Sequence, residues 1–211
     1  MDSSRVKRLC KGRSSEQQQI IHYFCDDRGC LSKGVPDTEF DANKNRQIET
    51  LNLKKKGLGK LGIDEDQVQE VEPICLIGPV YKEGWHRRGS DNINRYSVYQ
   101  VTYIFCSAEQ VYVYQYKIDL ASDEKKERAE EYFYKDITNF TTNDDTEELE
   151  FEVTKGCMNQ TETKRIKVDT NAFKIAVPGG DPFICSMVSN DEIEGQIQAL
   201  KAKLREKKNA K

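Results

Sequence analysis

The sequence predicts an α+β protein, in which a helical N-terminal region precedes seven antiparallel strands and one C-terminal helix. Eight of the ten tyrosines lie between residues 95 and 140, where side chains alternate at strand spacing. Alternation indicates strands because successive side chains of a strand point to opposite faces. Residues 149–153 and 165–168 alternate in the same way. An apolar stripe with helical spacing follows near the end of the chain.

A change of composition after residue 72 divides the chain. Residues 1–72 have few apolar positions and read as helices and loops, which predicts a helical N-terminal region. Within it, residues 1–14 are basic and polar, and we expect them to be mobile. The first longer helix is expected to begin after Ser14 or Ser15, because serine is a favourable N-cap. Residues 73–211 contain the strand patterns and the final helix.

The tyrosine-rich stretch predicts three neighbouring strands. Residues 99–105 and 112–120 alternate, and the four residues 107–110 between them suffice for a tight connection. Residues 122–131 are mostly charged, so we expect a loop there before the third strand. These strands would form the centre of an antiparallel sheet.

A second hairpin is expected further along the chain, after a turn at Asp144-Asp145. We predict that residues 148–154 pair with residues 163–169, in a register that sets Phe151 opposite Ile166. This register places the apolar residues on one face and pairs glutamates with basic residues on the other. A slip of one residue would bring Phe151 across from a charged side chain.

The C-terminal segment is predicted to be an amphipathic helix. Ser189 and Glu192 have the spacing of a capping box, and basic residues gather toward the end of the helix. The apolar stripe consists of Ile193, Ile197, Leu200 and Leu204. We expect this stripe to pack onto its own chain; a coiled coil with a second copy is the alternative.

Seven antiparallel strands followed by one amphipathic helix resemble the pleckstrin-homology-like (PH-like) barrel. In that superfold two sheets pack at an angle and the helix plugs one open end. The resemblance covers about residues 94–208, and the phrases YIFCSAEQVYVYQYKIDL and EYFYKDITNF are similar to bacterial PH/GRAM-type members in uncharacterised families. The resemblance implies a seven-stranded barrel or sandwich capped by the C-terminal helix. It also implies a non-enzymatic role, although a fold alone does not fix a function.

Charge is distributed unevenly along the chain. The formal net charge is −3, which argues against a general nucleic-acid binder. Residues 1–13 contain five basic groups and one acid, whereas residues 119–150 contain twelve acids and four bases. In PH-like proteins that bind phosphoinositides, basic residues surround the first hairpin loop. The corresponding loop here, residues 107–110, has no base, so the sequence predicts no inositol phosphate binding.

Seven cysteines at irregular spacing predict reduced thiols and a cytoplasmic location. Cys10, His22, Cys25 and Cys30 could form a zinc site, since His22 and Cys25 would share one helix face. Their spacing is loose, however, and no second tight cysteine pair accompanies them. We therefore expect no metal and no other cofactor, and leave a zinc site open as the alternative.

The stretch from Gly57 to Gly62 matches the pattern G-x-G-x-x-G of dinucleotide-binding loops. That chemistry requires a buried strand before the loop, so that the turn delivers a helix N-terminus to the pyrophosphate. Residues 52–56 are polar and rich in lysine instead. The glycines are therefore expected to mark the ends of short helices.

The candidate site for a partner is Trp85-His86-Arg87-Arg88. Arginines give bidentate donors and an indole gives a desolvating face, a combination suited to an anion or to an acidic patch. In the alternative interpretation Trp85 covers an edge of the barrel and the arginines are solvated. No sequence pattern for nucleophilic or metal-assisted catalysis accompanies these residues, so no catalytic residue is assigned.

These observations favour a non-enzymatic cytosolic interaction module that binds protein through a PH-like barrel. The first alternative is unspecific association with a membrane surface through the basic N-terminal arm and the lysine-rich end of the last helix. An enzyme with an unrecognised site ranks last. The sequence predicts neither the oligomeric state nor the identity of the partner.

Overall fold

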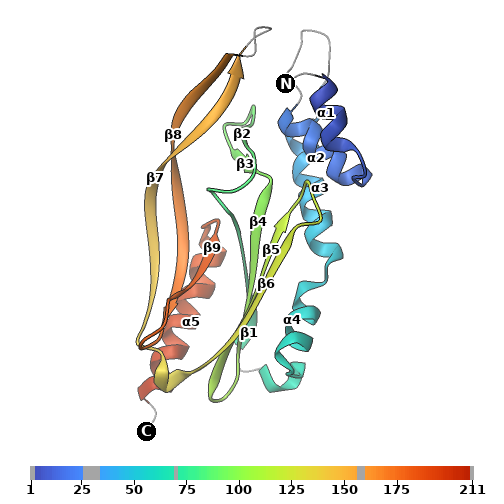
Figure 1. Ribbon diagram of the computed structural model, residues 1–211. Coiled ribbons are helices and arrows are strands. Elements are labelled where there is room, and N and C mark those ends of the chain that lie inside the picture. The colour runs from blue at the N-terminus through green and yellow to red at the C-terminus, as the bar shows by residue number, and fades with distance from the viewer. Residues whose placement is uncertain (1–2, 26–33, 69–70, 156–159, 210–211) are drawn as a thin grey trace.

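The computed structural model describes residues 3–25, 34–68, 71–155 and 160–209, with the backbone alone for residues 3, 149–155, 160–164, 166, 208 and 209. The fold is α+β. A four-stranded sheet runs through the middle of an elongated molecule, with helices along one face and a second sheet and the C-terminal helix at the other (Figure 1). No helix in this part of the chain is long and apolar enough to cross a membrane.

The N-terminal helices are α1 (Ser3–Cys10), α2 (Ser15–Cys25), α3 (Asp37–Thr50) and α4 (Leu53–Leu61), followed by the short 3-10 helix η1 (Glu65–Val68). The expected start of α2 is confirmed. Ser14 Oγ accepts a hydrogen bond from the Gln17 N–H (3.2 Å) and Gln17 Oε1 accepts one from the Ser14 N–H (3.0 Å). Together these two bonds satisfy donors at the start of the helix.

Residues 1–14 were expected to be mobile, but α1 occupies residues 3–10. Val6 is buried in the core beneath it, and Leu9 and Cys10 are partly buried against the same core. The basic composition of residues 1–14 did not predict a packed helix. The few apolar side chains on one side of α1 are nevertheless enough to hold it against α2. Whether the N-terminal helices form a unit separate from the sheet stays a prediction.

The central sheet contains β1 (Val71–Pro79), β4 (Val98–Cys106), β5 (Gln110–Asp119) and β6 (Lys125–Phe133), all antiparallel in the order β1-β4-β5-β6. The tight connection between β4 and β5 is confirmed, since the Ser107 N–H donates to the Gln110 carbonyl oxygen at 2.9 Å. Alternate residues of β4 pack on opposite sides. Tyr99 and Phe105 lie in the core with the helices, and Ile104 lies in the core with α5.

The charged loop expected at residues 122–131 is mostly strand. β6 begins at Lys125, and only residues 120–124 connect it to β5. Charged side chains are compatible with β6 because it is the outer strand of its sheet. Glu127, for example, accepts a hydrogen bond from Lys56 of α4 at 2.6 Å.

The second sheet contains β7 (Asn139–Lys155), β8 (Gln160–Ala176) and β9 (Phe183–Met187) in the order β7-β8-β9. The turn expected at Asp144-Asp145 is absent, because both residues lie inside β7. β8 likewise joins two predicted strands into one of 17 residues. Polar residues inside a long exposed hairpin resemble a turn signal when they are seen in sequence alone.

The hairpin between β7 and β8 exists, but its predicted register is wrong by two residues. Leu149, rather than Phe151, lies opposite Ile166. A shift of two residues leaves the alternation intact and still sets a glutamate, Glu148, opposite Lys167. Alternation and charge therefore could not separate the two registers. The predicted inward orientation of the Leu149, Phe151 and Ile166 side chains lies outside the described residues.

The seven-stranded barrel is not confirmed, because none of the described sheets closes. The two main sheets instead cross at β9. The Val188 N–H donates to the Ile77 carbonyl oxygen (3.0 Å), and a Cβ at Gly78 would collide with the backbone of Ser186 and Met187. Glycine at this position allows the backbones of β1 and β9 to touch. A sheet crossing of this kind joins the layers without closing the hydrogen-bonded ring.

The C-terminal helix α5 (Asp191–Asn209) packs onto its own chain, as expected. Ile197, Leu200 and Leu204 are almost fully buried between the two sheets. The predicted capping box is wrong by one residue, because Asn190 Oδ1 accepts the hydrogen bond from the Ile193 N–H (2.8 Å). Asparagine competes well with serine for the N-cap position, which explains the shift.

The glycine pattern at residues 57–62 does not form a phosphate-binding loop. Gly57 and Gly59 lie inside α4, and Gly62 ends that helix in the left-handed conformation at φ 68°. A Cβ at Gly57 would lie 2.8 Å from Tyr114 Cδ1 of β5. Gly57 thus allows α4 to approach the sheet closely.

Candidate functional site

The four residues of the predicted site lie on the small hairpin of β2 (His86–Arg88) and β3 (Asn94–Tyr96), and alternation divides them between two faces. Arg87 faces α2. The guanidinium carbon of Arg87 lies 4.7 Å from the centre of the Tyr23 ring. A guanidinium N–H of Arg87 donates a hydrogen bond to the Tyr23 carbonyl oxygen. The Trp85 ring lies 6.2 Å from that of Phe24. Arg87 and Trp85 therefore help to hold α2.

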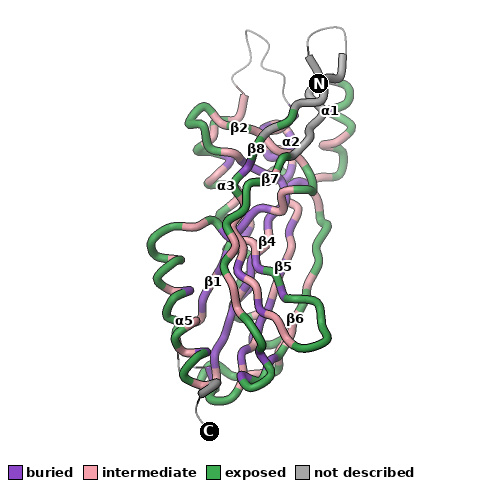
Figure 2. The backbone as a smooth tube through the Cα atoms, turned by 90° about the vertical axis from the view of Figure 1, so that its left-hand side faces the viewer, coloured by how far each residue is buried: buried purple, intermediate pink, exposed green. Residues whose placement is uncertain are grey.

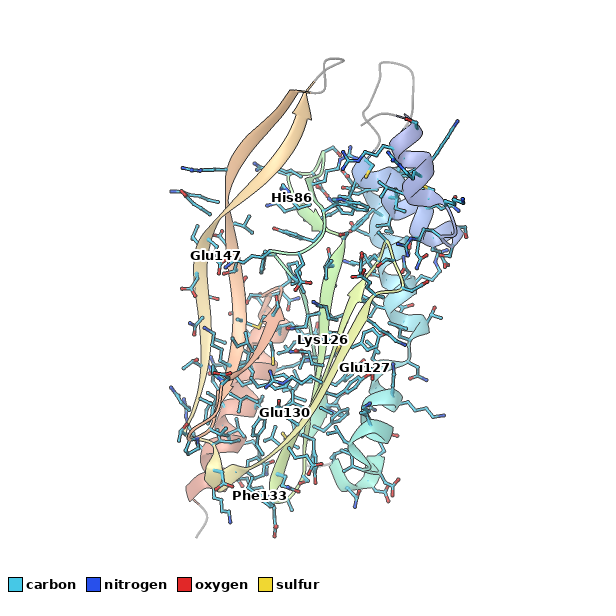
Figure 3. The ribbon with its side chains drawn as sticks, viewed as in Figure 1. His86, Lys126, Glu127, Glu130, Phe133 and Glu147 are labelled. Carbon is cyan, nitrogen blue, oxygen red and sulfur yellow. The ribbon has the colours of Figure 1, made fainter. Side chains whose placement is uncertain are left out.

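His86 and Arg88 point to the other face of the hairpin. The His86 ring lies 5.9 Å from the Tyr96 ring, and burial lowers the pKa of His86, which favours a neutral imidazole. His86 pairs with Tyr96 at the base of the hairpin, and Figure 3 labels it in the upper half of the molecule. Arg88 is exposed. The role of all four residues in partner binding stays a prediction, and the structure separates them into two pairs.

A buried ion-pair network lies behind the same hairpin and was missed by sequence analysis. Arg95 is almost fully buried and makes bidentate contacts with two carboxylates: Asp41 of α3 (3.1 and 2.7 Å) and Asp91 of the hairpin loop (2.9 and 2.7 Å). These bonds hold the pKa of Asp91 well below its usual range. Arg95 thus joins α3 to the β2–β3 hairpin. Only the fold brings these residues together, since 54 positions separate Asp41 from Arg95.

Asp37 extends this network to the start of α3. Its carboxylate accepts hydrogen bonds from the Ser90 N–H (2.7 Å), the Ser90 hydroxyl (2.6 Å) and the Tyr23 hydroxyl (2.8 Å). The bonds from Ser90 are the largest cause that lowers the pKa of Asp37 to about 2. All of these contacts tie one element to another, which indicates a structural role for the network.

The possible zinc ligands are only partly brought together. Cys10 Sγ lies 3.8 Å from His22 Nε2, across the contact of α1 with α2. Cys25 is buried, and Cys30 lies outside the described residues. Within the described part of the chain, no group of three or more histidine, cysteine, aspartate or glutamate side chains could hold a metal ion. Of the four predicted ligands, Cys10 and His22 are those for which the described residues show direct contact.

A cleft of about 440 Å³ lies between the two sheets. It opens beyond β9, on the side of the sheet crossing away from α5. One wall comes from the second sheet, where residues that share a face line the cleft. These residues are Asn143, Asp145 and Glu147 of β7, Thr170, Ala172 and Lys174 of β8, and Ile184 and Ser186 of β9.

The floor of the cleft is fixed by two hydrogen bonds at the sheet crossing. Gln100 Oε1 of β4 accepts a bond from the Ser186 N–H, and the Ser186 hydroxyl donates to the Pro79 carbonyl oxygen, both at 2.8 Å. Both bonds join the central sheet to β9. The floor is therefore rigid and already formed without a ligand.

The rim of the cleft is formed by residues 80–83, which follow β1. Tyr81 is half-buried there, with its ring 5.3 Å from that of Tyr96, and burial raises its pKa. Lys82 Nζ lies 3.0 Å from a Glu147 carboxylate oxygen across the mouth (Figure 3 labels Glu147 on β7). Both side chains are well exposed, so solvent screens this pair strongly and it can open at little cost.

The lining of the cleft combines amides, hydroxyls and a few charges with a larger share of apolar surface. Amide and hydroxyl groups both donate and accept hydrogen bonds, as the peptide backbone requires. The volume lies within the range of about 300–1,000 Å³ that is common for binding sites. Sequence analysis had no signal for this cleft, because its residues come from separate strands and a loop.

Comparisons of the chain with models of protein families, with curated proteins and with solved structures found no match.

Proposed function

We propose that this chain is a non-enzymatic protein-binding module on a PH-like scaffold, and that the cleft takes a segment of the protein partner. The observation that carries the proposal is the position of the cleft. α5 fills the space between the sheets on one side of the crossing at β9, and the cleft occupies the other side. The scaffold thus has one plugged end and one open end.

The order of the elements supports the PH-like part of the proposal. Within the residues that the resemblance covers, β4, β5 and β6 pair in chain order, β7 to β9 form the second sheet, and a terminal helix follows. β1 precedes this stretch and adds an outer strand to the first sheet. The resemblance noted in the sequence implies this succession of two sheets and a plugging helix. The β2–β3 hairpin is an addition between β1 and β4.

The chemistry of the lining supports a peptide segment as the ligand. The Asn143 side chain can donate and accept hydrogen bonds with a peptide backbone. The Thr170 and Ser186 hydroxyls already donate to carbonyl oxygens of the chain, so their oxygens can only accept further bonds. Asp145 and Lys174 at the walls can fix the direction of the segment through charge. The floor is preorganised by the bonds of Ser186, which reduces the entropy lost on binding.

Association with a membrane surface is the less favoured alternative. The basic face of α1 and the lysine-rich end of α5 lie at opposite ends of the molecule (Figures 1 and 2). A flat bilayer could meet both only if the long axis lay parallel to it. The two basic segments therefore do not form one surface for anionic lipids.

The proposal is tested by filling the cleft. Ala172 lies on its wall, opposite Asn143 of β7 and Ser186 of β9. We expect Ala172→Trp to lower the capture of a specific partner from a lysate of the source organism at least tenfold. The captured protein is then purified, and its affinity for both forms is measured by titration calorimetry.

The matched control is Ala108→Trp, which adds the same side chain at an exposed position in the β4–β5 turn. This variant should capture the partner as the unmodified chain does. Equal capture by Ala172→Trp, with its fold verified by circular dichroism, would remove the cleft as the binding site and the proposal with it.

A further inference from the structure

The outer edge of β7 is a second surface with the geometry of a binding site. β7 pairs with β8 along all of its 17 residues, and no other described strand pairs with its opposite side. Every second residue of such a strand directs its N–H and C=O groups outward. In Figure 1 the first half of β7 runs along the left margin of the molecule, the side that faces the viewer in Figure 2.

The exposed part of this edge is acidic on both faces. β7 contains six acidic residues and one lysine. Asp144, Asp145 and Glu148 are exposed, and alternation places Asp145 on the face opposite to the other two. A strand laid against this edge would therefore meet carboxylates above and below its own plane.

The contacts that these carboxylates already make leave most of their capacity free. Asp144 accepts one hydrogen bond from the Asn171 side-chain amide (2.6 Å), and Glu148 lies 4.0 Å from Lys167. The Glu148 and Lys167 side chains are both largely exposed, so this pair is weak. A carboxylate can accept about four hydrogen bonds.

Two candidate occupants of the edge are excluded, one by its charge and one by its place in the fold. A second copy of β7 would bring acids opposite acids, which destabilises a strand pair. The basic N-terminal segment of the same chain is held in α1, with Val6 buried in the core. What remains is a basic segment from another protein.

We infer that the outer edge of β7 binds an extended, lysine- and arginine-rich segment of a partner protein by strand addition. The inference rests on the proposed protein-binding function and assigns the backbone edge of β7, which is separate from the floor of the cleft; the Asp145 side chain borders both surfaces. Backbone hydrogen bonds supply the affinity, and the acids select the strand. Because both faces are acidic, the segment needs basic residues at neighbouring positions and not only at alternate ones.

The test uses a capped nine-residue peptide, Lys-Thr-Lys-Arg-Val-Lys-Arg-Thr-Lys, and a twin whose alternate backbone nitrogens on the pairing edge are methylated. The twin keeps every charge but cannot complete the ladder. We expect it to bind at least tenfold more weakly in fluorescence anisotropy at physiological salt. Amide exchange should also slow in residues 143–148 with the first peptide only.

Charge-reversing variants test the location of the binding site. Replacement of Asp144, Asp145 and Glu148 by lysine should weaken binding of the unmethylated peptide at least tenfold. The matched control replaces Asp66, Glu109 and Asp136 by lysine. These three residues are exposed outside β7 and change the net charge by the same amount. This control should weaken binding less than threefold.

Three outcomes would overturn the inference: equal binding of the methylated twin, equal weakening by the two triple variants, or no binding of either peptide. Each of them leaves the cleft untouched, because Ala172→Trp is judged on the captured partner and not on this peptide. Conversely, a cleft variant without effect would remove the proposed function while the peptide could still bind β7.

Discussion

The two faces of the central sheet are covered in different chemical ways. The face toward α1–α4 buries tyrosines together with polar groups, among them Gln17, Asn43 and Arg95. The face toward α5 and β9 buries mainly aliphatic, aromatic and cysteine side chains, with Thr102 between the layers. One face is thus fixed by hydrogen bonds and ion pairs as well as packing, and the other mainly by packing.

The difference predicts how each face responds to change. Apolar packing loses stability in proportion to the volume removed and is insensitive to pH. A buried polar network loses stability when one partner is left without its bond, and it depends on protonation. The following variants separate the two cases, in order of expected effect.

The largest effect is expected for Leu200→Asp in the apolar face. Leu200 is fully buried between α5 and both sheets. Truncation of a buried leucine to alanine already costs about 2–5 kcal/mol, and an unpaired buried carboxylate adds to that. We expect a large fall in the melting temperature of the monomer. The control, Ala202→Asp on the exposed side of α5, should change it little, and a dimer converted to an equally stable monomer would contradict the prediction.

A smaller effect is expected for Arg95→Met in the polar face. Removal of one partner from a fully buried ion pair costs about 3–5 kcal/mol. Here Asp41 and Asp91 each keep about 40% of their side-chain exposure, so water can take over part of the lost bonds. We expect a loss of about 2 kcal/mol in urea unfolding. Arg88→Met, at an exposed position of the same hairpin, is the control and should be nearly neutral.

Two glycines of α4 give a prediction in which the sign of the effect differs. Gly57→Ala places a methyl group against Tyr114 and should destabilise the protein, since overpacking costs about 1–3 kcal/mol and outweighs the gain in helix propensity. A Cβ on Gly59 would instead meet no neighbouring element within 4 Å. Gly59→Ala should therefore stabilise by up to about 1 kcal/mol in urea unfolding. Equal effects at the two positions would show that α4 does not pack closely on β5.

The smallest effect concerns pH and the Asp37 carboxylate. Its pKa falls from 3.8 to about 2 on folding, so the carboxylate stabilises the folded state above about pH 4. This contribution is lost as the pH falls toward 2, because the proton then binds in both states. Asp37→Asn should be less stable than the unmodified chain at pH 7, and the difference should shrink by pH 2. Urea unfolding at both pH values measures it, and a constant difference would contradict the assignment.

Sequence analysis recovered the features that depend on neighbouring residues. The β4–β5 turn follows from four residues between two alternating runs, and the start of α2 follows from a serine cap. The apolar stripe of α5 follows from helical spacing, and its docking onto the same chain was also predicted. The candidate site was recovered less well. Trp85 and Arg87 face α2, and the cleft and the Arg95 network were not foreseen.

Local sequence patterns specify which segments form most of the strands and helices, because the period of apolar residues and the caps are local properties of the chain. The way in which these elements meet depends on contacts between residues that are distant in the sequence. The β7–β8 register is one case, because two registers satisfy the same alternation and charge pairing. The open sheets are another, because close contact of β1 and β9 at Gly78 depends on residues more than 100 positions apart. Burial also gives the same residue type different roles. The buried Arg95 joins α3 to the β2–β3 hairpin, whereas Arg88 is exposed to solvent.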